Sequence, residues 1–269
     1  MLPSFVVPLL NIEMSSYSAV RTLYFIAAFV LTLGLSARQG IGRDVIVWAF
    51  ALGVPLGMAG AHLLDSLEYA DRYQTLADYF GRDGSSIYGA FLVVLPLVWA
   101  YARWWGVPPL RLLDVGAPAM ALGEAMTRVG CFLNGCCYGI PWDGPWAVRF
   151  PRASFAYRDQ QANGLLGPEA GHSLPVHPVQ LYSVVAMSIV FAVLLWQLNR
   201  RRADGRAFFT FVLAYGALRL AVAPLRTEAL ASARVFSLVF VMVGAAGLFL
   251  VQHAAGRRTT LAPGRALGS

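Results

Sequence analysis

Residues 178–198 read PVQLYSVVAMSIVFAVLLWQL and contain no charged side chain. A helix that crosses a bilayer needs about 20 consecutive apolar residues, each rising about 1.5 Å. The stretch meets this length, and it is too long and too continuously apolar for a strand of a membrane barrel. It therefore predicts a transmembrane helix and an all-α membrane fold.

Six further stretches of the chain have the same character. The composition agrees: 58% of the residues are hydrophobic and 13% are charged, about half the charged share of a soluble domain. This composition excludes a disordered chain, a disulfide-rich secreted module and a nucleic-acid-binding domain. We predict a polytopic protein with seven transmembrane helices at 17–36, 45–64, 86–104, 115–134, 178–198, 207–224 and 235–253.

The basic residues, all of them arginine, predict the orientation of these spans. The net charge is +7 and there is no lysine. Eleven arginines fall in the gaps and tail on one side of a seven-span chain, and seven fall on the other. Because positive residues favour the cytoplasmic side, we expect the N-terminus outside and the C-terminus in the cytoplasm. The basic charge then reflects topology, and no nucleic acid partner is expected.

The longest connection, 139–177, lies between the fourth and fifth predicted spans, on the extracytoplasmic side. It is rich in glycine, proline and aromatic residues, and Trp142 and Trp146 suit the membrane interface. A loop of this length usually has a function. We predict one seven-span domain over 1–253 that includes this loop, followed by a disordered cytoplasmic tail, 254–269.

Ionisable residues inside predicted spans are candidates for function, because burying them in hydrocarbon is costly. Glu124 and Arg128 lie four residues apart and so share one helix face. They either neutralise each other to allow insertion or leave the guanidinium to bind an anion. Arg219 has no acidic residue nearby in its own span. It either extends to the interface or binds a lipid phosphate.

The end of the fourth predicted span, Arg128 to Gly139, reads RVGCFLNGCCYG. Its glycines permit close backbone approach, and Asn134 offers both hydrogen-bond donors and acceptors. The segment is either a pocket for a lipid headgroup or a plain helix end capped by glycine.

Three cysteines, Cys131, Cys136 and Cys137, lie in this segment. Adjacent cysteines are poor spacing for zinc, and there is no CxxC pair. We therefore predict no metal and no cofactor, and favour buried neutral thiols over a reactive thiol.

The motif at 128–139 resembles the signature of the prolipoprotein diacylglyceryl transferase family. Three other regions agree with it over nearly the whole chain: His177-Pro-Val-Gln-Leu-Tyr182, Tyr215-Gly216-Ala-Leu-Arg219 followed by Arg226, and Tyr17-Ser18 at the first span. The resemblance implies an enzyme of the bacterial cytoplasmic (inner) membrane. Its expected partners are phosphatidylglycerol, a membrane-anchored preprolipoprotein and the lipid bilayer.

The reaction implied by the resemblance moves a diacylglyceryl group from phosphatidylglycerol to the thiol of a lipobox cysteine, releasing glycerol phosphate. The resemblance points to Arg128 and Arg219 as phosphate-binding catalytic groups. Tyr88 and His177 are the candidates for the base that removes the thiol proton; the alternative is that the charge of the arginines deprotonates the thiol without a protein base. The residues expected to bind substrate are Asn134, Gly139, Tyr215, Tyr17, Gln180 and Arg226.

The chain also departs from the family pattern where protons are handled. The departures are Tyr88 for a histidine, Cys131 for an asparagine, Cys136 for an acidic residue, His62 for an arginine and Ala223 for an acidic residue. They leave three alternatives open: a related transferase with another acceptor or donor lipid, a non-catalytic membrane protein that binds anionic lipid, and a small-molecule transporter.

Overall fold

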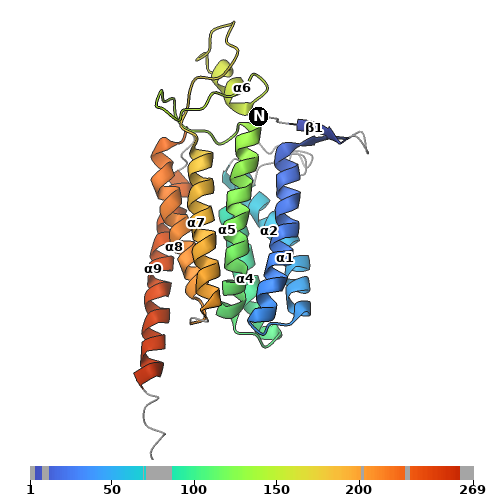
Figure 1. The fold of residues 1–269 in the computed structure, drawn as a ribbon, viewed down its shortest axis with the longest axis vertical. Coiled ribbons are helices and arrows are strands. Elements are labelled where there is room, and N and C mark those ends of the chain that lie inside the picture. Colours follow the sequence, from blue (N-terminus) through green and yellow to red (C-terminus); the bar gives the residue numbers. More distant parts are fainter. Residues whose placement is uncertain are drawn as a thin grey trace, which may run out of the picture. The chain divides into compact units, whose positions relative to one another are not determined.

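The structure is a computed structural model, and it is almost entirely helical (Figure 1). The residues that it describes are 4–7, 12–68, 70, 87–200, 203–227 and 231–260. The elements in chain order are β1 (Ser4–Val7), β2 (Ile12–Ser15), α1 (Ser16–Arg38), α2 (Arg43–Glu68), α4 (Ile87–Trp104), α5 (Pro109–Asn134), α6 (Phe155–Ala162), α7 (Val179–Asn199), α8 (Arg206–Val222), the 3-10 helix η2 (Ala223–Leu225) and α9 (Ala231–Thr260). The two short strands pair antiparallel, with Ser4 opposite Ser15.

Each of the seven predicted spans coincides with a helix. Five helices are long and apolar enough to cross a membrane: α1, α2, α7, α8 together with η2, and α9. The apolar part of α4, Tyr88–Trp104, is shorter than these five helices. Helix α5 is long but carries Arg111, Asp114, Glu124 and Arg128, which lower its hydropathy. The chain is therefore a multi-pass helical membrane protein, and the number seven stays a prediction.

The chain forms two compact units, 1–30 with 117–269, and 31–116. In the larger unit, α7, α8 and α9 run side by side (Figure 1). Glycines allow α8 and α9 to approach closely. A Cβ added to Gly216 would lie 2.8 Å from the Ser237 carbonyl oxygen, and one added to Gly244 would lie 2.5 Å from the Leu213 nitrogen. Small residues at such crossings are typical of membrane helix packing.

Helix α1 packs against α5 in the same unit through aromatic rings set on glycines. A Cβ added to Gly130 would lie 3.1 Å from the Cδ2 atom of the Tyr17 ring. The Tyr24 ring packs against Gly123 in the same way. The two glycines are seven residues apart and so lie on one face of α5.

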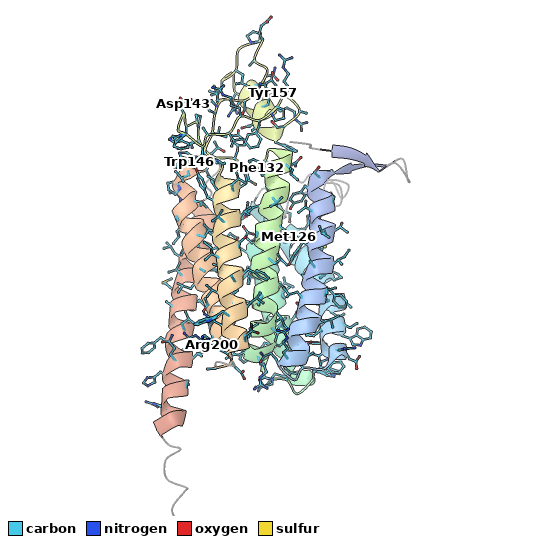
Figure 2. All side chains as sticks on the ribbon, in the orientation of Figure 1. Met126, Phe132, Asp143, Trp146, Tyr157 and Arg200 are labelled. Atoms are coloured by element: carbon cyan, nitrogen blue, oxygen red, sulfur yellow. The ribbon has the colours of Figure 1, made fainter. Side chains whose placement is uncertain are left out.

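The connection between α5 and α7 is an ordered subdomain with its own small core, beyond the ends of these two helices (Figure 1). Ser154 begins α6 by accepting a hydrogen bond from the Tyr157 nitrogen. Tyr138, Phe150, Ala156 and Val176 form the core. Isolated bridges join Val176 to both Pro141 and Val148. Figure 2 shows Asp143, Trp146 and Tyr157 at this end, and Arg200 at the opposite end of α7.

The smaller unit contains α2 and α4, packed against each other through small residues. A Cβ on Gly60 would lie 2.7 Å from the Gly89 carbonyl oxygen. The Tyr101 hydroxyl donates a hydrogen bond to the Val45 carbonyl oxygen at 2.7 Å.

Helix α9 corrects the predicted tail. It continues through 254–260, so this part of the tail expected to be disordered is helical. These positions contain no proline that would end the helix. The remainder, 261–269, lies outside the described residues, as do Arg201, Arg202 and most of the acidic gap at 71–86.

Candidate functional site

The end of α5 is a Schellman turn that brings two cysteines together. Gly135 has a φ of +71° and follows the last helical residue. Its nitrogen donates to the Phe132 carbonyl oxygen at 3.3 Å, and the Cys136 nitrogen donates to that of Cys131 at 3.1 Å. This pattern places Cys136, the residue after the glycine, beside Cys131 in the last turn of the helix. The structure confirms the glycine-capped helix end, and the pocket for a lipid headgroup stays a prediction.

Cys137 completes a cluster of three thiols. It has a φ of 56°, the left-handed region that side chains other than glycine rarely adopt. The Sγ atoms of Cys131, Cys136 and Cys137 all lie within 4.8 Å of one another, and all three cysteines are free. Cys131 is buried, whereas Cys136 and Cys137 are half-buried. Hydrogen bonds from the other two thiols lower the pKa of Cys137, and the charges of Arg128 and Arg226 lower it further.

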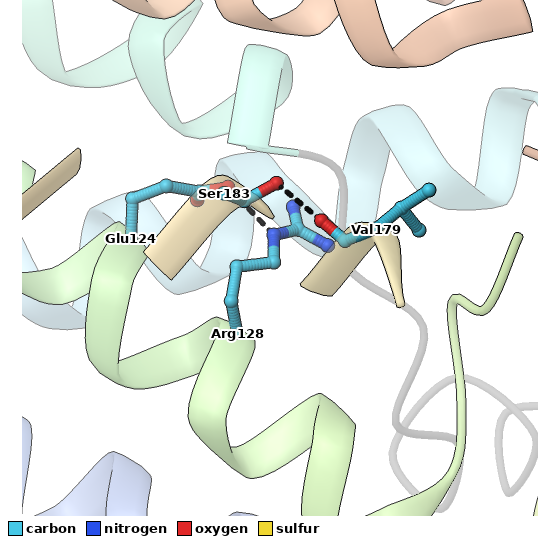
Figure 3. A network of polar contacts seen from close by, with 4 residues as sticks. All are labelled: Glu124, Arg128, Val179 and Ser183. Carbon is cyan, nitrogen blue, oxygen red and sulfur yellow. Dashed lines mark hydrogen bonds and ion pairs between the residues drawn. The ribbon is translucent and has the colours of Figure 1, made fainter. Parts of the chain in front are cut away.

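Glu124 and Arg128 form the ion pair that their spacing predicts. The Arg128 Nε donates to the Glu124 Oε1 at 2.7 Å, and 13% and 5% of the two side chains are exposed. In Figure 3 the guanidinium extends from α5 toward the first turn of α7, where Ser183 donates to the Val179 carbonyl oxygen. The Glu124 bond uses the Nε of Arg128, and the terminal nitrogens point toward α7.

Two more arginines, Arg219 and Arg226, share the electrostatic surroundings of Arg128. Burial lowers the pKa of Arg226, and the positive charges of Arg219 and Arg128 lower it further. An arginine stays charged despite such shifts. The buried Nε of Arg226 has no hydrogen-bond partner in the described part of the chain. Arg128 is paired with Glu124, but Arg226 keeps a buried unpaired donor on a charged side chain, which is an environment that an anion stabilises.

Backbone pairing fixes Arg226 in place. Gly139 forms an isolated bridge with Arg226 and donates from its nitrogen to the His177 carbonyl oxygen at 3.1 Å. A Cβ on Gly139 would lie 2.6 Å from the His177 Cβ and 2.7 Å from the Leu225 carbonyl oxygen. Gly139 is therefore the position at which the loop, the start of α7 and the end of η2 meet.

The two tyrosines predicted to bind substrate in the larger unit, Tyr17 and Tyr215, interact with the cysteines and with Arg128, respectively. Tyr215 is completely buried, its ring packs on Phe211 and Phe240, and it interacts electrostatically with Arg128. Tyr17 interacts electrostatically with all three cysteines, and Arg21 lies over its ring at 5.7 Å.

Asn134 and Gln180 contact the cysteine turn. The Asn134 amide donates to the Cys136 Sγ at 4.0 Å. The Gln180 amide nitrogen donates to the Cys136 carbonyl oxygen at 2.8 Å, while its buried Oε1 has no partner among the described residues. These two side chains hold the turn that carries the thiols.

His177 is held between the loop and α7. Its ring stacks on Trp142, with centroids 4.2 Å apart, and its Nδ1 lies 3.2 Å from the Tyr182 hydroxyl. The contact between Trp142 and His177 could not be predicted from the sequence, because it depends on how the loop folds back.

Tyr88 and His62 belong to the other unit, 31–116. Tyr88 is buried near the start of α4, and His62 is half-buried in α2. The catalytic role of Tyr88 stays a prediction.

The family profile of prolipoprotein diacylglyceryl transferase matches residues 4–250. The chain belongs to this family. It is 31% identical to a phosphatidylglycerol–prolipoprotein diacylglyceryl transferase of Clostridium tetani, over 82% of this chain and 84% of that protein. The protein of the same name from Finegoldia magna is 27% identical, over 89% and 91%, and that from Neisseria gonorrhoeae is 31% identical, over 75% and 77%. We call Arg128, Arg219 and Arg226 the arginine cluster. It belongs to a member of a diacylglyceryl transferase family.

Proposed function

We propose that this protein transfers a diacylglyceryl group from phosphatidylglycerol to the thiol of a lipobox cysteine in a membrane-anchored preprolipoprotein, releasing glycerol phosphate. The observation that carries the proposal is that the charges of Arg128 and Arg219 act on Arg226, whose buried Nε has no hydrogen-bond partner among the described residues. Family membership indicates the reaction. The arginines provide the positive charge that the leaving phosphate requires.

The leaving group explains why three arginines are useful. When the carbon–oxygen bond to glycerol breaks, the phosphate oxygen takes its electron pair and gains negative charge. Fixed cations beside that oxygen stabilise the transition state more than the neutral surroundings of a membrane can. Guanidinium groups bind phosphate oxygens in a two-pronged geometry, and they stay charged when buried.

The roles of the other candidates follow from their positions. Tyr215 interacts electrostatically with Arg128, and Tyr17 with the three cysteines; we assign both to orienting the headgroup. Asn134, Gln180 and Gly139 hold the segment that carries the cysteines and Arg226. His177, in the loop, remains a candidate for a protein base. Tyr88, in α4, remains a second candidate because of the family resemblance and not because of its position.

The finer topology belongs to the same proposal. Seven helices cross the bacterial inner membrane as a single domain over 1–253, with the N-terminus outside and the C-terminus in the cytoplasm. Support comes from the position of Arg200, at the opposite end of α7 from the loop that carries Trp146 (Figure 2). The arginine cluster then lies near the outer leaflet, where the loop can guide a peptide.

The decisive experiment incubates the purified protein with phosphatidylglycerol and a lipobox peptide, and measures the product mass and the released glycerol phosphate. The expected result is a peptide heavier by one diacylglyceryl group, with one glycerol phosphate per peptide. Glycerol phosphate without modified peptide would instead indicate another acceptor. Lipid binding without any release would indicate a non-catalytic protein.

A further inference from the structure

The three cysteines form a compact group of sulfur atoms, and the charges of Arg128 and Arg226 act on one of them, Cys137. We propose that Cys131, Cys136 and Cys137 bind one zinc ion, whose fourth position takes the acceptor cysteine and holds it as the thiolate. The acceptor half of this inference depends on the proposed function, whereas the zinc site itself does not.

The sulfur geometry suits zinc after a small adjustment. Zinc binds thiolates at about 2.3 Å in a tetrahedron, which places the sulfur atoms about 3.8 Å apart. The three Sγ atoms already lie within 4.8 Å of one another. Side-chain movements of about 1 Å or less at each cysteine close this difference, well within the range of one χ1 adjustment.

The backbone explains why an unusual spacing brings three ligands together. The Schellman turn places Cys136 beside Cys131, and the left-handed conformation of Cys137 turns the third side chain to the same side. Neither contact follows from the ligand spacing of known zinc sequence motifs, which explains why the sequence argued against a metal.

Neighbouring side chains supply the supporting hydrogen bonds that zinc sites commonly have. The Asn134 amide reaches the Cys136 sulfur, and the buried Gln180 holds the Cys136 carbonyl oxygen at 2.8 Å. Such contacts orient the ligands, and their loss typically weakens metal binding 10–100-fold.

The number of ligands favours an open site over a closed structural one. Among the described residues, the group of potential ligands has three members, where structural zinc has four. Cys136 and Cys137 are half-buried, so a fourth sulfur can approach. Zinc with four thiolates carries two negative charges, which the nearby Arg128 and Arg226 guanidinium groups balance.

The chemistry of this step balances without any oxidant or reductant. The acceptor thiol binds zinc and releases its proton to water, since a coordinated thiol is deprotonated. Its sulfur then forms a bond to the glycerol carbon of the lipid. The carbon–oxygen bond to the phosphate breaks, and glycerol phosphate leaves with the electron pair. The thioether product is neutral and binds zinc weakly, so it dissociates.

The test uses the full chain, without a histidine tag, in detergent or nanodiscs after reduction and chelation. Zinc content is measured by mass spectrometry after ZnCl₂ is added and excess removed. We expect about one zinc per chain, lost in Cys131→Ser, Cys136→Ser and Cys137→Ser. His172→Ala is the matched control, because this exposed loop histidine is a zinc ligand type outside the cluster. It should leave the zinc content unchanged.

A second measurement keeps the site testable if the cysteine variants do not fold. Wild-type protein loaded with Co²⁺ should show the thiolate-to-metal charge-transfer band of a site with three sulfur ligands, and the lipobox peptide should intensify it. Wild-type protein that takes up no zinc, or variants that retain it, would overturn the site.

Activity then separates the two proposals. Metal-free protein should form thioether at least tenfold more slowly than zinc-loaded protein. Equal rates would overturn the acceptor role and leave the proposed function standing. Zinc-loaded protein with the cobalt band but without thioether would instead refute the proposed function, and the zinc site would stand.

Discussion

The Glu124–Arg128 pair allows a direct test of whether Arg128 serves insertion or catalysis. If the pair only neutralises charge, replacing both residues by methionine should leave both the stability and the activity of the protein unchanged. If Arg128 also binds phosphate, the double variant recovers stability but not activity. The single and double variants therefore give different results under the two interpretations.

The structure sets the expected magnitudes. Both side chains are almost fully buried, at 13% and 5% exposure, and joined at 2.7 Å. Arg128→Met leaves the Glu124 carboxylate buried without its partner, which costs about 3–5 kcal/mol of folding free energy. The double replacement by methionine returns to within about 1 kcal/mol of wild type, because no buried charge is left. Loss of a charge-stabilising donor lowers the rate about 10²–10³-fold in both variants.

Thermal unfolding in detergent measures the first quantity, and glycerol phosphate release measures the second. Full activity in the double variant would refute the phosphate role of Arg128. Double-variant stability as low as that of Arg128→Met would refute the assignment of the pair as mutually compensating.

Three other predictions follow from close contacts in the larger unit. Gly139→Ala should lower the free energy of unfolding by about 1–3 kcal/mol, because the new Cβ would lie 2.6 Å from the Cβ of His177. Thermal unfolding measures this, with Gly167→Ala as the control because that position has open space in the same loop. Equal melting temperatures of the two variants would contradict the prediction. Trp142→Ala removes the ring stacked on His177, so trypsin should cleave the loop at Arg149 or Arg158 faster than in wild type, whereas Trp146→Ala, an exposed ring, should change the rate less. Gly244→Leu should separate α8 from α9 and lower the melting temperature; Gly256→Leu, which meets nothing within 4 Å, is the control, and an equal effect of both would count against this helix contact.

The sequence predicted the features that depend on local pattern. Long apolar runs predicted the helices, and the spacing of Glu124 and Arg128 predicted their ion pair, which the structure confirms. Both depend on residues close in the chain, for which helix geometry alone fixes the distances.

Contacts that depend on chain reversal were not predictable in the same way. The Schellman turn at Gly135 decides that Cys131 and Cys136 meet, and the pairing of Gly139 with Arg226 joins residues far apart in sequence. The pattern C-x-x-x-G-C at a helix end was a usable signal for the first contact, since the glycine cap sets that geometry. The family resemblance made Arg226 a candidate binding residue, but its pairing with Gly139 required the fold.

Lipid selectivity tests the central claim most directly, namely that the arginine cluster binds the phosphate of an anionic lipid. Native mass spectrometry can compare retention of phosphatidylglycerol and of diacylglycerol, which lacks the phosphate, by wild type and by Arg219→Gln and Arg226→Gln. We expect wild type to prefer phosphatidylglycerol and each variant to lose about tenfold of that preference, as the loss of one charged hydrogen bond implies. A preference that is unchanged in both variants would contradict the claim.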